Sequence, residues 1–173
     1  MGRKLTILLL CAVLFTTVKA QELFFDGELS THFDNTEYTG SGLGDSRTIF
    51  AVRLIPTLDY RFSKNHSVVL GAELLKDFGS SHFLDDAKLV AYYQFQSEKY
   101  GANAGIFQRD KLVGNYSRAF FSDAYHIYNP LVQGIAMRHT GRSAFAELVV
   151  DWDGLYSPEV REKFRILVAG RGN

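Results

Sequence analysis

The stretch TIFAVRLIPTLDYRF at residues 48–62 decides the fold class of this 173-residue chain. From Phe50 to Phe62 its even-numbered positions are all apolar or aromatic, whereas its odd-numbered positions include Arg53, Asp59 and Arg61. Successive side chains of a strand point to opposite faces of a sheet, so this period of two predicts a strand with one apolar and one charged face. Pro56 removes a backbone donor within that strand, and we expect a bulge or local distortion of the ladder there.

The same alternation recurs along the chain and predicts an all-β protein. Seven further segments show it, at residues 23–33, 68–77, 87–95, 101–109, 131–139, 143–152 and 161–169. Segments of about 9 to 11 residues have the length of tilted strands that cross a bilayer. A soluble β-sandwich shows the same alternation, so the period alone leaves both architectures open.

The connections between these segments favour the membrane architecture. Long and short connections alternate: residues 34–47 precede 63–66, residues 78–85 precede 97–100, and residues 110–130 precede 140–142. Outer-membrane barrels have short periplasmic turns and longer external loops. Aromatic residues also stand at both ends of the segments, as interfacial girdles require. The sequence therefore predicts an antiparallel up-and-down transmembrane β-barrel, of which about eight strands are seen.

The N-terminus predicts export. Residues 1–20 combine Arg3 and Lys4, an apolar core and a small-residue end, which is the pattern of a cleaved secretory signal peptide. The only cysteine, Cys11, lies inside that apolar core, too early for a lipid anchor. We therefore expect a barrel domain at residues 21–173 in the outer membrane of a Gram-negative bacterium. Its expected partners are outer-membrane lipid and, in transit, the barrel-assembly machinery; the balance of 19 basic and 19 acidic residues argues against nucleic acid.

Four short stretches carry a resemblance to a known group. TEYTG at 36–40, KDFGS at 76–80, YSRAFFSD at 116–123 and DWDG at 151–154 resemble uncharacterised porin-like outer-membrane β-barrel proteins of Bacteroidota. Those proteins are longer, and outer-membrane barrels commonly end on an aromatic residue, whereas this chain ends in GRGN. The resemblance therefore implies the N-terminal part of a larger barrel, incomplete at its C-terminus.

The charged faces of the segments supply candidate lumen-lining residues. They are Asp26, Glu28, Arg53, Asp59, Arg61, Glu73, Asp77, Lys88, Arg138, Glu147, Asp151 and Arg165. In a porin they would form a mixed-charge wall that gives modest selectivity. In a closed eight-strand barrel they would be paired buried ions, and on a soluble sheet they would be scattered solvated charges.

The third long connection, residues 110–130, is unusually aromatic for a solvated loop. Tyr116, Arg118, Phe120, Tyr125 and His126 are candidates for a constriction that folds inward and narrows a pore. An equal alternative is that this segment packs on the barrel rim or forms another strand.

No motif predicts chemistry. Ser117, Asp123 and His126 are close in sequence, but no Gly-x-Ser-x-Gly turn exposes a serine. The histidines, His32 among them, lack metal-ligand spacing. We therefore predict no catalytic residues, no metal and no cofactor, and a porin-like channel or binding protein for small polar solutes. The alternatives are a closed eight-strand outer-membrane enzyme or adhesin and a soluble exported β-sandwich binding module.

Overall fold

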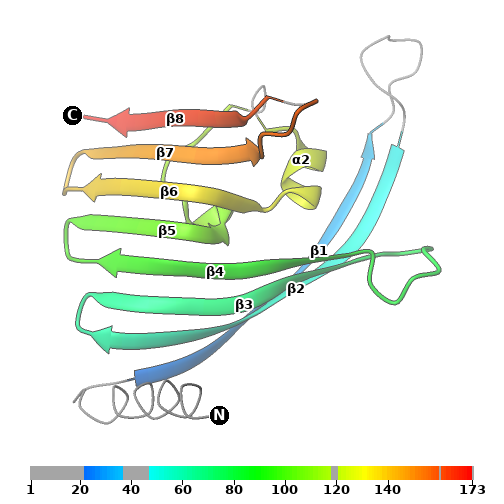
Figure 1. Cartoon of the computed structure of the whole chain (residues 1–173), viewed down its shortest axis with the longest axis horizontal. Helices are drawn as coiled ribbons and strands as arrows, with labels where there is room; N and C mark the ends of the chain where they lie inside the picture. The colour runs from blue at the N-terminus through cyan, green and yellow to red at the C-terminus, as the bar shows by residue number, and fades with distance from the viewer. Residues whose placement is uncertain (1–21, 37–46, 118–120, 160, 173) are drawn as a thin grey trace.

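The computed structural model describes residues 22–36, 47–117, 121–159 and 161–172, and these residues form one antiparallel sheet (Figure 1). Its eight strands follow one another in chain order as a meander. They are β1 (Glu22–Thr36), β2 (Arg47–Ser63), β3 (His66–Asp77), β4 (Asp86–Gln96), β5 (Tyr100–Gln108), β6 (Leu131–Thr140), β7 (Phe145–Gly154) and β8 (Lys163–Arg171). The predicted all-β class, number of strands and up-and-down order are confirmed.

The sheet does not close into a barrel. Within the described residues β1 pairs only with β2, and β8 pairs only with β7. Both outer strands therefore keep one edge without a partner strand. The predicted leader at residues 1–20 lies outside the described residues and stays a prediction.

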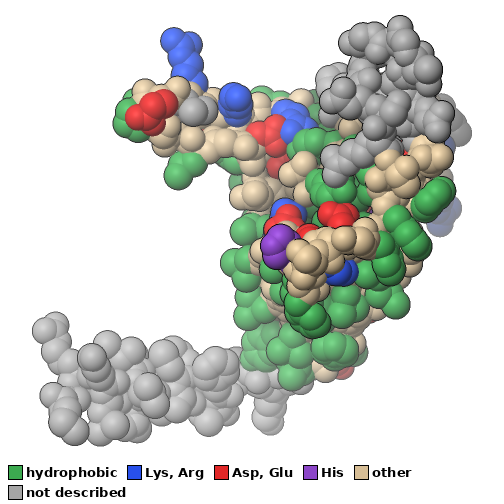
Figure 2. Space-filling model, turned by 90° about the vertical axis from the view of Figure 1, so that its right-hand side faces the viewer, with side chains coloured by type: hydrophobic (Ala, Val, Ile, Leu, Met, Phe, Trp, Pro, Cys, Tyr) green, Lys and Arg blue, Asp and Glu red, His purple; other side chains and the backbone are tan. Residues whose placement is uncertain are grey.

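The two faces of the sheet differ as the alternation predicts. We call the face that carries the charged positions the inner face and the opposite one the outer face. On the outer face Leu29, Leu70 and Val168 expose 71%, 54% and 74% of their surface. Figure 2, which looks onto the strand ends at the right of Figure 1, shows hydrophobic side chains over much of the described surface. Large, exposed apolar side chains thus cover the outer face of the sheet.

The connections also alternate as predicted. The short ones, at residues 64–65, 97–99 and 141–144, all lie at one end of the sheet, and the strand ends that the long ones join lie at the other (Figure 1). Aromatic rings gather on the outer face near both ends. Phe50 contacts Phe33 and Phe78 near the long connections, with centroid distances of 5.8 and 4.2 Å. Phe62 and His66 stack near the short ones.

The ladder between β2 and β3 is interrupted at Pro56. Pairing runs to Leu54 and resumes at Thr57, opposite Gly71, in the same register. The expected local distortion is confirmed, without a shift of register at this point. A Cβ atom on Gly71 would lie 2.3 Å from the carbonyl oxygen of Pro56, so only glycine fits beside the interrupted strand.

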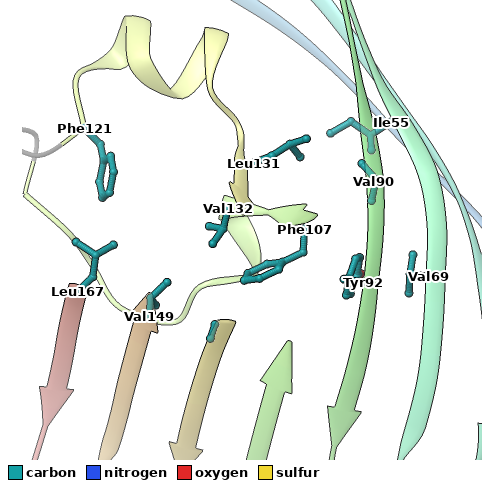
Figure 3. Close-up of a cluster of buried hydrophobic side chains, with 11 residues drawn as sticks. Ile55, Val69, Val90, Tyr92, Phe107, Phe121, Leu131, Val132, Val149 and Leu167 are labelled. Carbon is teal, nitrogen blue, oxygen red and sulfur yellow. The ribbon is translucent and has the colours of Figure 1, made fainter. Parts of the chain in front are cut away.

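The long connection between β5 and β6 folds back onto the inner face. It contains a 3-10 turn at Arg109–Lys111 and the helix α2 (Asp123–Tyr128). Phe121, 1% exposed, joins the buried cluster in Figure 3, where it lies above Val132, Val149 and Leu167. Ile127 of α2 belongs to a second cluster on β2 and β3. Neither helix among the described residues has the length and apolar character needed to span a bilayer.

Candidate functional site

A buried arginine on β2 fixes α2 against the sheet. Arg53 donates from Nε to Oε1 of Glu73 at 3.1 Å, and from Nη2 to the carbonyl oxygens of His126, at 3.2 Å, and of Ile127. Glu73 is fully buried and also accepts from Nζ of Lys88 at 3.3 Å. Because carbonyl groups at a helix C-terminus carry partial negative charge, a guanidinium is a favourable partner for them. Arg53 therefore sets where His126 lies.

A second buried pair holds the two ends of the same connection. Arg109 donates from Nη2 to Oδ2 of Asp151 and to the carbonyl oxygen of Leu131, both at 2.8 Å. Its guanidinium also lies over the ring of Phe121, at 4.6 Å from the centroid. The guanidinium of Arg165 lies over the ring of Tyr125, at 4.7 Å from the centroid. Two cations therefore pack against the aromatic residues around α2.

The middle of this connection is anchored by Glu147. Its carboxylate, on a residue only 3% exposed, accepts from the backbone N–H groups of Val113 and Gly114 at 2.7 and 2.8 Å, and from the hydroxyl of Tyr116 at 2.8 Å. Burial and this hydrogen bond raise the pKa of the Tyr116 phenol, which keeps it a donor. Residues 112–116 therefore lie over the inner face of β7.

The anchored connection and β1 enclose a cavity of about 230 Å³ on the inner face. Its lining residues come from β1, β2 and residues 108–130; they are Glu28, Ser30, His32, Arg53, Ile55, Gln108, Arg109, Asp110, His126 and Pro130. We call this the inner cavity. It collects a hydroxyl, two imidazoles, two carboxyl groups and two guanidinium groups around one space.

Within the inner cavity, Ser30 and His32 form a hydrogen bond of 3.2 Å between Oγ and Nε2. The two residues are two positions apart on β1, so strand geometry directs both side chains to the inner face. Arg53 is the register partner of Ser30 on β2. A serine hydroxyl bonded to an imidazole, beside fixed positive charge, is the arrangement that activates a nucleophile and stabilises an oxyanion.

The predicted inner-face residues are distributed over several contacts. The structure brings together Arg53, Glu73 and Lys88, and separately Arg109 with Asp151. Six others are in smaller contacts: Asp26 with the backbone of Gly27, Arg61 with Glu22, Asp77 with Tyr128, Arg138 with Gln96, Glu147 with residues 113–116 and Arg165 with Asp153. Glu28 lines the inner cavity, and Asp59 keeps one buried oxygen without a partner. Whether any of them lines a channel stays a prediction.

The predicted constriction residues pack rather than project. Tyr116 and Tyr125 contact the ring of Phe121, and so does His126. Arg118 and Phe120 lie outside the described residues. The described part of the connection lies on the inner face of the sheet, neither on the rim nor in a further strand, and a constriction by these residues stays a prediction.

Sequence reasoning missed the Ser30–His32 pair. It also missed that residues 108–110 line the inner cavity. A signal for the pair existed, because Ser30 and His32 share the polar face of the first segment with Glu28. No signal in the sequence places residues 108–110 at the inner cavity, because their position depends on how the following connection folds. Within the described residues no group of three His, Cys, Asp or Glu side chains is placed to hold a metal ion.

Comparison with known proteins assigns a family. None of the curated protein sequences matches the chain significantly. The sequence model of the lipid A 3'-O-deacylase-type family matches residues 15–170, which is most of the chain. That family comprises outer-membrane β-proteins that hydrolyse lipid A, a lipid of the outer membrane of Gram-negative bacteria.

This match corrects three predictions and supports two others. The porin-like resemblance and the non-catalytic channel for small polar solutes are wrong, because the matching family is not a porin family. The prediction that the protein is not an enzyme is wrong for the same reason, and the alternative of an outer-membrane enzyme agrees better. The predicted outer-membrane location and lipid partner agree with the family. The chain belongs to the lipid A 3'-O-deacylase-type family.

Proposed function

We propose that this protein hydrolyses an acyl ester of lipid A in the inner cavity, with Ser30 as nucleophile and His32 as general base. The observation that carries the proposal is the 3.2 Å hydrogen bond between Ser30 Oγ and His32 Nε2 inside a cavity of a hydrolase-family protein. An ester of a hydroxyl on a sugar is the bond that the family description implies, and a Ser–His pair is suited to cleave it.

The reaction has two steps. Oγ of Ser30 attacks the acyl carbonyl carbon while its proton moves to Nε2 of His32. The carbon–oxygen bond to the sugar then breaks, the sugar oxygen takes the proton from His32, and the acyl group stays on Ser30. Water, deprotonated by His32, then releases the fatty acid and restores the hydroxyl of Ser30.

The guanidinium groups supply the electrostatic part of this proposal. Arg53 and Arg109 both line the inner cavity and are held by buried carboxylates. Positive charge held in place beside the ester stabilises the oxygen that becomes negative in the tetrahedral intermediate. Because Arg53 is hydrogen-bonded to the carbonyl oxygen of His126, the same contact holds His126 beside the inner cavity.

We propose further that the eight strands span the outer membrane with the outer face against lipid. In the hydrocarbon core the backbone groups of a free strand edge have no water to bind, so the parts of the β1 and β8 edges that lie within the core must be paired. They can pair with each other, which closes a barrel, or with further strands. The exposed apolar side chains of the outer face support this placement.

Deacylation of lipid A by purified variants tests the function. The protein in detergent micelles is incubated with lipid A, and the mass of the lipid is followed by mass spectrometry. We expect loss of one acyl chain with the unchanged protein, and a rate at least about a hundredfold lower for Ser30→Ala and His32→Ala. Ser67→Ala, which removes a buried inner-face serine near the short turns, is the control and should keep the rate. Equal rates in all variants would refute the assignment of the pair.

A further inference from the structure

A second pocket, which is open to the surface, borders the inner cavity at β1. Its volume is about 500 Å³, and its lining residues are Thr31, His32, Phe33, Asp34, His126 and Ile127. It shares His32 and His126 with the inner cavity. We call it the edge cavity.

The residues of the edge cavity belong to both faces of β1. His32 and Asp34 have the parity of the inner face, whereas Thr31 and Phe33 have that of the outer face, where Phe33 is 70% exposed. A cavity lined from both faces of one strand passes over the edge of that strand. The edge cavity therefore joins the apolar outer face to the space that holds Ser30 and His32.

Closure of the sheet would leave this part of β1 open. β1 has 15 residues and β8 has nine, so β8 can cover at most nine residues of β1. The antiparallel meander places Arg171 of β8 and Glu22 of β1 at the same end, that of the short turns. Pairing with Arg171 opposite Glu22 covers residues 22–30. It leaves the remainder of β1, at the end next to the long connections and outside the hydrocarbon core, without a partner strand.

We propose that the lipid substrate reaches the Ser30–His32 pair sideways from the membrane, across the uncovered edge of β1 at residues 31–34. This inference rests on the proposed function. The acyl chains of the lipid lie against the outer face beside Phe33. The ester group of the lipid enters through the edge cavity, which His32 and His126 line. The substrate class is then a membrane-embedded lipid whose ester lies close to its chains, and a water-soluble ester needs no such route.

A blocking experiment separates the route from the chemistry. The only cysteine of the chain, Cys11, lies in the predicted leader, so one introduced cysteine can be modified selectively. Thr31→Cys is folded in micelles, transferred to phospholipid vesicles that contain lipid A, and labelled with a bulky maleimide. Leu70→Cys, on the exposed outer face of β3, is labelled in the same way as a control. Hydrolysis of lipid A and of p-nitrophenyl acetate is measured before and after labelling.

We expect the label on Thr31→Cys to slow lipid A hydrolysis at least tenfold and to change p-nitrophenyl acetate hydrolysis less than twofold. The label on Leu70→Cys should change neither. An unchanged lipid A rate after labelling of Thr31→Cys would overturn the lateral route, and so would equal loss with both substrates. Absence of hydrolysis of both substrates by the unlabelled proteins would instead overturn the proposed function, and the route with it.

Discussion

Removal of the Asp151 carboxylate should strongly destabilise the protein. Asp151 accepts from Arg109 at 2.8 Å and from the backbone N–H of Gln133 at 3.0 Å, and the side chains of the ion pair are 5% and 2% exposed. Asp151→Ala leaves a buried guanidinium without its counter-charge and an N–H without its acceptor. Loss of one partner of a buried pair costs about 3–5 kcal/mol. Arg109→Met with Asp151→Leu removes both charges and should cost far less than the two single changes together.

Urea unfolding in micelles measures these differences. The single tryptophan, Trp152, is next to Asp151 in sequence, and its fluorescence reports the transition. With a slope of about 1–3 kcal/mol per molar urea, Asp151→Ala should lower the midpoint by at least about 1 M. Glu22→Ala breaks the exposed pair with Arg61 and should cost less than about 1 kcal/mol. Strictly additive losses in the double variant would refute the claim that the two charges depend on each other.

Three further outcomes follow from single contacts. Gly71→Ala should cost about 1–3 kcal/mol in the same unfolding assay, because the added Cβ collides with the Pro56 carbonyl; an unchanged midpoint would contradict this. Glu147→Gln should speed amide hydrogen exchange at residues 113–114 at least about tenfold, since the charged acceptor is lost; equal protection would rule out the anchor. A hydrogen bond from Ser80 lowers the pKa of Asp85 to about 2, so the stability that this carboxylate contributes should persist above the normal carboxyl range and disappear as pH falls toward 2. Carboxyl titration by NMR should show a higher pKa in Ser80→Ala, and an identical pKa would contradict the assignment.

The pattern of faces and connections could be predicted because it is local. Alternation along β2 directs Arg53 inward and Leu54 outward whatever the neighbouring strands are, and the lengths of the connections follow from the strand limits. Closure could not be predicted in the same way. It depends on whether β1 and β8 meet, and these strands are at opposite ends of the chain.

The site was missed because its parts come from distant segments. Ser30 and His32 are on β1, whereas Gln108 to Asp110 and His126 approach them only after residues 109–130 fold onto the inner face. That folding depends on carboxylates such as Glu147, which accept hydrogen bonds from the backbone N–H groups of Val113 and Gly114. Nearly every residue type has a backbone N–H, so the sequence at 113–114 gives no sign of this contact. The same charges suggested a channel wall, but in the structure several of them hold this connection in place.

Labelling of the nucleophile tests the central claim most directly. The purified protein is treated with a fluorophosphonate, which phosphonylates activated serines, and the adduct is located by peptide mass spectrometry. We expect one adduct, on Ser30, that disappears in His32→Ala and persists in Ser67→Ala. An adduct on another serine, or equal labelling of Ser30 in His32→Ala, would contradict it.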